Sequence, residues 1–178
     1  MEARTEERHK GSGDSPIGAE TMSPPRELDE FHDFYKRWSS QIFTFCLLNS
    51  GDRGEAEWLT EATFGLYFRC ADFVALHHGS QVPVALLRFA SDLANAHCRR
   101  RRGEDSCGFA QALLELPFKD RAAFILVSIL RVQPSVAAVA LRLRSSQLAA
   151  YWTRAALRLR WIWLSTGQAA ENGLAQCA

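Results

Sequence analysis

Residues 84–102 read VALLRFASDLANAHCRRRR, and this stretch decides the fold class. Apolar side chains recur along it at helical spacing, which predicts an amphipathic helix from about Val84 to Arg102. Its expected buried stripe is Leu86, Phe89, Ala90, Leu93, Ala94 and His97. Four arginines in a row close the helix, and positive charge at a C-terminal end suits the helix dipole. Such a cluster also offers a site for phosphate groups.

The stretch before this helix predicts two more helices. The first should run from about Glu27 to Leu48, and Gly51 should end it. Asp52 is a good N-cap for the second, which should run to about Leu76. A loop at 77–83 then leads into the helix described above. Strand-like alternation is absent from the sequence.

The stretch after this helix predicts a second helical cluster. Gln133-Pro134 should start one of its helices, because proline is favoured at the first helical position. A tight turn at Arg142–Arg144 follows, and Ser145 should cap the last helix, which should fray from about Ser165. Two short helices are expected earlier, near 109–116 and 119–130.

The sequence therefore predicts an all-α protein made of two small helical domains joined by a short linker, the second domain containing a helix-turn-helix. The expected divisions are a disordered tail at 1–25, a first helical domain at 26–102, a linker with a short helix at 103–115, a helix-turn-helix domain at 116–164 and a frayed tail at 165–178. A recognition helix of this kind places its N-terminal residues at base edges in the DNA major groove. A plain helical hairpin is the alternative interpretation.

Charge is divided unevenly along the 178 residues. Residues 1–79 contain 8 Lys and Arg against 14 Asp and Glu, a net charge of −6, whereas residues 80–178 contain 13 against 6, a net charge of +7. An acidic front and a basic back suit a chain that touches a protein with one half and a polyanion with the other. A chance distribution over solvated helix faces is the alternative.

The sequence favours no enzyme and no cofactor. Carboxylates are scattered, and neither a Gly-rich phosphate loop nor a Cys–His pairing stands out. The five cysteines show no CxxC spacing and are expected to be free thiols, without a metal site, in the reducing cytoplasm. The apolar stretch 122–141 is interrupted by Arg131 and Pro134, so no membrane insertion is expected.

The order of these motifs resembles bacterial sigma factors of the extracytoplasmic-function (ECF) type, over about residues 31–160. In that family the second helix docks on core RNA polymerase. Residues 55–64, EAEWLTEATF, match its pattern at Ala56, Glu57, Leu59, Thr63 and Phe64. The resemblance therefore implies polymerase binding by Glu57, Leu59, Thr63 and Phe64. Trp58 stands where the family has an acid, and Glu61 where it has a glutamine.

Residues 84–102 resemble the family's promoter-melting helix, which contacts the −10 element. The matches are Leu86, Arg88, Ala90, Leu93, Ala94, His97, Arg99 and Arg100. The resemblance implies DNA contacts by Arg88, Arg99, Arg100, Arg101 and Arg102. Asp92 stands where the family has an asparagine. The loop at 77–83 corresponds to the family's base-capturing loop.

The rear half matches the family's sequence pattern near its beginning and near its end. The matches are Leu116, Pro117, Arg121, Ala122, Arg154, Ala155, Leu157 and Arg158. Between them Arg142 replaces the family's turn glycine, and two basic residues of the recognition helix are missing. Ser146, Gln147, Tyr151 and Arg154 are the DNA contacts that the resemblance leaves there.

Two hypotheses follow. In the first, the chain is a sigma-like transcription initiation factor that binds core RNA polymerase and directs it to promoter DNA, with an anti-sigma factor as a further candidate partner. In the second, it is a degenerate sigma-like protein that acts through protein–protein contacts without promoter recognition. Trp58, Trp152, Trp161 and Trp163 would then be interface anchors, with core packing as the alternative for each, favoured for Trp152.

Overall fold

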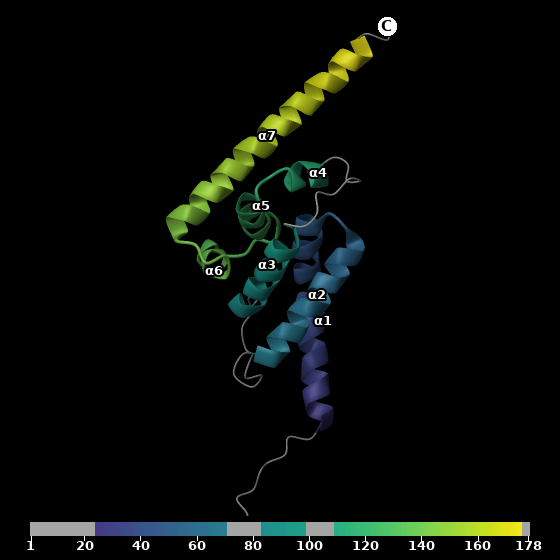
Figure 1. The fold of residues 1–178 in the computed structure, drawn as a ribbon, viewed down its shortest axis with the longest axis vertical. Coiled ribbons are helices and arrows are strands. Elements are labelled where there is room, and N and C mark those ends of the chain that lie inside the picture. Colours follow the sequence, from purple (N-terminus) through teal and green to yellow (C-terminus); the bar gives the residue numbers. More distant parts are fainter. Residues whose placement is uncertain (1–23, 71–82, 99–108, 176–178) are drawn as a thin grey trace, which may run out of the picture.

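The computed structural model describes residues 24–70, 83–98 and 109–175, and in these ranges it contains helices and turns but no strand. The elements are α1 (Pro24–Ser50), α2 (Arg53–Cys70), α3 (Val84–Cys98), α4 (Phe109–Leu114), α5 (Phe118–Phe124), the π-helical turn η2 (Ile125–Ile129), α6 (Pro134–Ala140) and α7 (Ser145–Ala175) (Figure 1). The predicted all-α class is confirmed. Of the tail predicted at residues 1–25, Pro24 and Pro25 belong to α1, and the rest lies outside the described residues. The predicted helix ends at Leu76 and Arg102 also lie outside the described residues.

The turn between α1 and α2 follows from two adjacent residues. Gly51 adopts a left-handed backbone with φ 77°, and its N–H donates to the Leu47 carbonyl at 2.8 Å. Glycine tolerates this conformation because it lacks Cβ. Asp52 then caps α2 by accepting the Glu55 N–H at its Oδ1, at 2.7 Å. The predicted helix stop and the predicted N-cap are both confirmed, while α1 extends beyond its predicted range at both ends.

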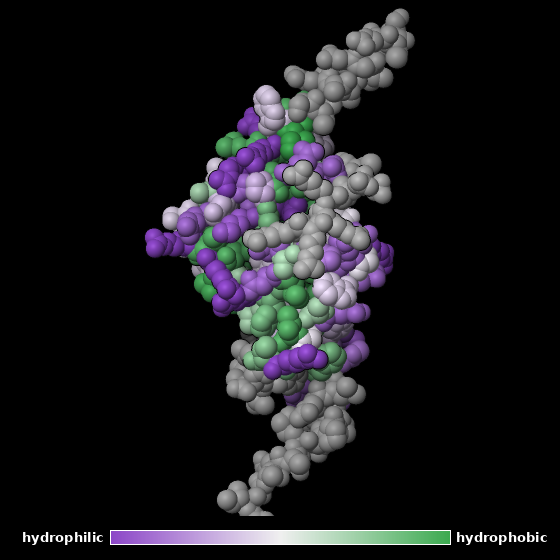
Figure 2. Space-filling model, viewed as in Figure 1, coloured by the Kyte–Doolittle hydropathy of each residue, from purple (hydrophilic) through white to green (hydrophobic). Residues whose placement is uncertain are grey.

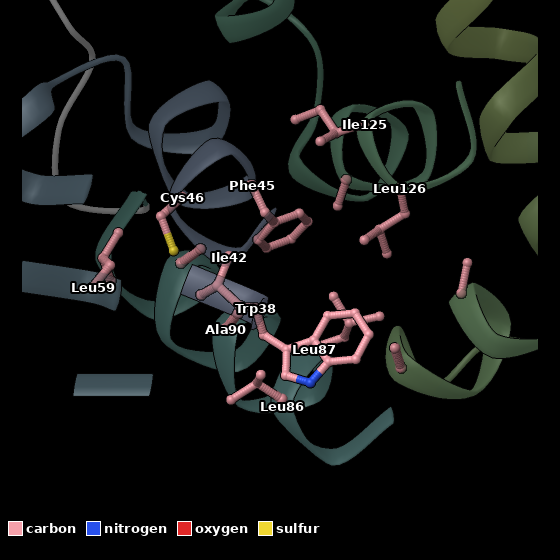
Figure 3. Packing of buried hydrophobic residues seen from close by; sticks show 14 of the residues in the cluster. Trp38, Ile42, Phe45, Cys46, Leu59, Leu86, Leu87, Ala90, Ile125 and Leu126 are labelled. Carbon is pink, nitrogen blue, oxygen red and sulfur yellow. The ribbon is translucent and has the colours of Figure 1, made fainter. Parts of the chain in front are cut away.

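One hydrophobic core joins the front helices to the rear ones. It contains side chains of α1, α2 and α3, which form the body in the lower part of Figure 1, and of α5, η2, α6 and the start of α7. Figure 3 shows Ile42 and Phe45 of α1 in the same packed region as Leu87 of α3 and Ile125 and Leu126 of η2. The division into two domains stays a prediction, and the halves assigned to them meet on this shared core.

A smaller cluster fixes α4 on the long helix α7. Ala112, Leu113 and Leu116 are buried there against Ala155 and Leu159. Because α4 belongs to the predicted linker, this packing holds the linker helix against the rear half. α7 then runs on diagonally away from the body (Figure 1).

The rear half differs from its predicted outline at two places. The helix expected at 119–130 is α5 followed by the π turn η2, in which the Leu130 N–H donates to the Ile125 carbonyl at 2.9 Å. β-branched residues at 125, 127 and 129 lower the intrinsic α-helix propensity of this segment. α7 continues to Ala175, where fraying was expected from Ser165. Good helix formers at 168–171 extend it.

The α6–α7 turn, residues 141–144, has an arginine in a glycine-like conformation. α6 begins with Pro134 at its first position, as predicted. After it Arg142 has φ 54°, its N–H donates to the Val139 carbonyl at 3.1 Å, and the Leu143 N–H donates to the Ala138 carbonyl at 2.8 Å. This is a Schellman motif, whose left-handed position costs a non-glycine residue about 1–2 kcal/mol.

Candidate polymerase and nucleic-acid interfaces

The polymerase-binding residues implied by the resemblance do not form one surface. Glu57 is exposed on α2 and accepts a hydrogen bond from Arg53 Nε at 3.0 Å. Leu59, Thr63 and Phe64 are buried in the core, and Thr63 Oγ1 donates to the Leu59 carbonyl. These three therefore hold α2 in place instead of presenting a contact face. The exposed face of α2 consists of Glu57, Trp58, Glu61 and their neighbours.

Trp58 marks the place where α2 meets the end of α3. Its side chain is 53% exposed, and its ring centroid lies 5.4 Å from that of His97. His97 Nε2 lies 3.4 Å from Glu55 Oε1, which makes an ion pair when the imidazole is protonated. The indole therefore covers one side of the last described turn of α3, directly before the arginine run in the sequence.

The α3 helix presents the expected division into two faces. Leu86, Ala90 and Ala94 are fully buried, and Phe89, Leu93 and His97 are partly buried, as the stripe predicted. Arg88 is exposed on the opposite face. Arg99, Arg100, Arg101 and Arg102 lie outside the described residues, as do residues 77–82 of the predicted loop. Of the five arginines implied as DNA contacts in this part of the chain, the structure describes Arg88.

Asp92 lies one turn beyond Arg88 and contacts the rear half of the chain. Its Oδ2 accepts a hydrogen bond from Arg142 Nη2 at 2.7 Å. Both side chains are about half exposed. The resemblance singled out each residue as a departure from the family pattern, but the pairing of two residues 50 positions apart has no local sequence signal.

Ser146 and Gln147 are exposed in the first turn of α7, where a recognition helix would meet base edges. Gln147 also helps to start the helix, because its Oε1 accepts the Arg144 N–H at 2.9 Å. Ser145, the predicted cap, is instead the first residue of α7. The capping role therefore belongs to the glutamine, which reaches back as in one half of a capping box.

Arg154 is held by a buried carboxylate. Its Nε and Nη2 donate to Asp120 Oδ2 and Oδ1 at 2.8 and 2.5 Å, and its guanidinium lies 4.9 Å from the Tyr151 ring centroid. The hydrogen bonds to fully buried Asp120 raise the pKa of Arg154 further above its usual value. Tyr151 is half-buried and packs on the core. Both residues therefore brace α7 against α5.

Asp120 and Arg121 organise the rear half, although no sequence pattern marks Asp120 and only a motif match marks Arg121. Arg121 is buried, and its Nε donates to Asn49 Oδ1 of α1 at 3.2 Å. Its Nη1 donates to the Leu114 carbonyl of α4 at 3.1 Å. This side chain therefore links α5 to both α1 and α4.

Exposed apolar side chains continue along α7. Leu157, Trp161 and Leu164 recur at helical spacing and are exposed, as is Trp163. Figure 2 shows hydrophobic surface beside hydrophilic surface along the described part of this helix. Trp152, expected in the core, is 39% exposed, and its Nε1 donates to Ser128 Oγ at 2.7 Å.

Within the described ranges, no helix is long and apolar enough to cross a bilayer. In the same part of the chain, no group of three or more His, Cys, Asp and Glu side chains is placed to hold a metal ion.

Comparison with known proteins gives a likeness of fold. No family model matches the chain, and no curated protein matches it. Among solved structures, it is similar to the sigma factor RpoE from Bartonella quintana, which was co-crystallised with the anti-sigma factor NepR. The TM-score is 0.63 at 17% sequence identity, and the match covers 76% of this chain and 97% of that one. The chain therefore has a sigma-factor-like fold across nearly the whole of that neighbour.

Proposed function

We propose that this protein is a sigma-like transcription initiation factor of the ECF type, which binds core RNA polymerase in the cytoplasm and directs it to promoter DNA. The observation that carries the proposal is the fold, which matches 97% of a sigma factor's length. The motif order supports it independently, because the matching residues are spread over both halves of the chain. The charge division, acidic in front and basic behind, is consistent with one protein partner and one nucleic acid.

Core polymerase is proposed to bind the exposed face of α2. Glu57 has the family's residue type and is exposed on that face, while the buried Leu59, Thr63 and Phe64 keep the helix in position. Exposed Trp58 gives the face an aromatic anchor, a residue type that often dominates binding energy at interfaces.

Promoter DNA is proposed to bind Arg88 and the arginine run at 99–102 in the front half. Ser146 and Gln147, exposed at the start of α7, are the proposed contacts in the rear half. Tyr151 and Arg154 are proposed to contribute indirectly by fixing α7 on α5, since Asp120 already engages the Arg154 guanidinium.

A charge reversal on α2 tests the polymerase contact. In a titration against core RNA polymerase, Glu57→Lys should weaken binding about tenfold, which corresponds to about 1.4 kcal/mol. The matched control is Glu115→Lys, an exposed glutamate that follows α4, which should bind as the unmodified chain does. Equal affinities of the two variants would move the polymerase contact away from α2.

The α3 contact is tested separately, with the polymerase complex and fork-junction promoter DNA. Arg88→Ala should reduce DNA affinity and flatten its salt dependence by about one phosphate contact. Arg160→Ala removes an exposed arginine from α7 and is the control for net charge. An equal effect of both variants would indicate general electrostatic attraction without a defined site.

A second candidate function rests on α7. Its exposed Leu157, Trp161 and Leu164, with Arg158 and Arg160 nearby, suit a partner helix with apolar and acidic faces, and an anti-sigma factor is the candidate partner. The chain would then act through protein contacts without promoter recognition. Polymerase binding without any DNA capture in the titration above would favour this function.

A further inference from the structure

Two departures from the sigma pattern contact each other. The family asparagine of the promoter-melting helix is Asp92 here, and the family glycine of the turn is Arg142. Arg142 Nη2 donates to Asp92 Oδ2 at 2.7 Å across the two halves of the chain. Each change is unfavourable alone, since an acid on α3 repels DNA and an arginine strains a left-handed turn. Together they make a hydrogen-bonded ion pair.

The pair lies at the edge of a larger contact. α3 packs on α6 through the shared core, to which α3 contributes Leu87 and Ala90, and α6 contributes Ala137, Ala138 and Ala140. A half-exposed ion pair contributes little stability by itself. The buried residues therefore supply most of the free energy that holds α3 on α6. The ion pair fixes the position of the α6–α7 turn along α3, because it joins one residue of the turn to one residue of the helix.

This arrangement places the two proposed DNA-contacting elements together. α3 would read the −10 element, and the start of α7, next to the turn, would read the −35 element. The position numbers of the two elements place them roughly 25 base pairs apart, which is about 85 Å along B-DNA at about 3.4 Å per base pair. In the structure α3 packs on α6 in the shared core and is hydrogen-bonded to the α6–α7 turn, so the compact form described here cannot contact both promoter elements at once.

We propose that Asp92 and Arg142 form a clasp that holds the α6–α7 turn on α3, so that the chain stays closed to promoter DNA until the clasp is released. This inference rests on the proposed function for its consequence, but the clasp itself is a property of the isolated chain. The α2 face that carries Glu57 is opposite the buried face of this helix and is exposed in the closed form. Polymerase binding at α2 is therefore compatible with the clasp, whereas DNA binding is limited by the clasp.

Hydrogen exchange of the full chain tests the clasp directly. Asp92→Asn should raise the exchange of α3 backbone amides roughly two- to fivefold, the effect expected when a surface ion pair is removed, and Arg142→Gly should raise it to the same extent relative to a variant that relieves equal backbone strain. The matched control is Arg131→Gly. Arg131 is also an exposed arginine with a left-handed backbone, φ 56°, so glycine relieves the same strain without touching Asp92. The double variant Asp92→Arg, Arg142→Asp should restore slow exchange.

DNA capture by the polymerase complex provides a second readout. Whether the variants bind DNA more weakly or more tightly distinguishes simple electrostatics from release of a clasp. Arg142→Gly removes a positive charge, so simple electrostatics predicts weaker binding of fork-junction DNA, as expected for Arg131→Gly. Release of a clasp predicts the opposite, a severalfold tighter complex for Arg142→Gly alone.

Equal exchange in Arg142→Gly and Arg131→Gly, or weaker DNA capture by both, would overturn the proposal. If no form of the chain binds polymerase, the proposed function fails, and the hydrogen-exchange comparison still decides whether the clasp exists.

Discussion

Asp120 is a fully buried carboxylate whose partners lie on a different helix. It accepts two hydrogen bonds from Arg154, and Arg158 Nη1 lies 4.0 Å away. Asp120→Asn should lower the free energy of unfolding by about 1–3 kcal/mol, because a buried charged hydrogen-bond acceptor is replaced by an amide. Urea unfolding measures this change as a lower midpoint. Asp33→Asn, at an exposed site on α1, is the control and should leave the midpoint unchanged.

Tyr67 carries a hydroxyl group inside the aromatic part of the core. Its ring stacks on Phe34 with centroids 5.1 Å apart, and among the described residues its Oη has no hydrogen-bond partner. Burial raises the pKa of Tyr67 above its usual value of 10. The unfolded chain therefore releases this proton at a lower pH than the folded chain does.

The consequence is a decline of stability in alkali. As pH rises past 10, deprotonation favours the unfolded state, and the free energy of unfolding should fall. Tyr67→Phe should remove this part of the slope and raise stability at neutral pH by up to about 1 kcal/mol, since no buried hydroxyl is left unpaired. Denaturant unfolding at pH 7 and pH 11 measures both effects, with Tyr35→Phe as the control. A Tyr67→Phe variant with the unmodified slope would contradict this assignment.

At the scale of elements, the start of α2 depends on one cap. Asp52→Ala should cost about 1 kcal/mol of stability, because the Glu55 N–H loses its acceptor. Asp52→Asn keeps a good cap and should be close to neutral. Thermal unfolding of the two variants separates capping from charge, and equal destabilisation would assign the effect to charge.

Helix boundaries governed by local chemistry could be predicted from the sequence. Gly51, Asp52 and Pro134 act within a few residues of their own position, and each has its predicted role. The amphipathic stripe of α3 was predicted for the same reason. The π turn η2 was not, because a widened turn in a buried helix depends on what packs beside it and has no local sequence pattern.

The proposed sites were harder to predict because a motif match does not distinguish support from contact. Leu59, Thr63 and Phe64 match the family and are buried, whereas Glu57 on the same helix is exposed. The links between halves join residues far apart in the sequence. Asn49 and Arg121 are 72 positions apart, and Asp92 and Arg142 are 50 apart. No local pattern specifies either pair.

At the scale of the whole molecule, the shared core predicts cooperative unfolding. Side chains from both halves are buried in one cluster, so neither half keeps its full core alone. Differential scanning calorimetry should show one transition, with equal calorimetric and van't Hoff enthalpies. Two separate transitions would mean that the halves are independent domains.

The central claim is that this fold brings polymerase to promoter DNA, and one measurement tests it most directly. The purified chain is titrated with core RNA polymerase, and fork-junction promoter DNA is then added at two salt concentrations. The account predicts a stable complex that captures DNA with steep salt dependence. Replacing Arg99–Arg102 by alanine should flatten that dependence by about one unit of slope for each DNA phosphate that is no longer neutralised. A chain that binds neither polymerase nor DNA, or whose DNA capture keeps its salt slope without the four arginines, would contradict the account.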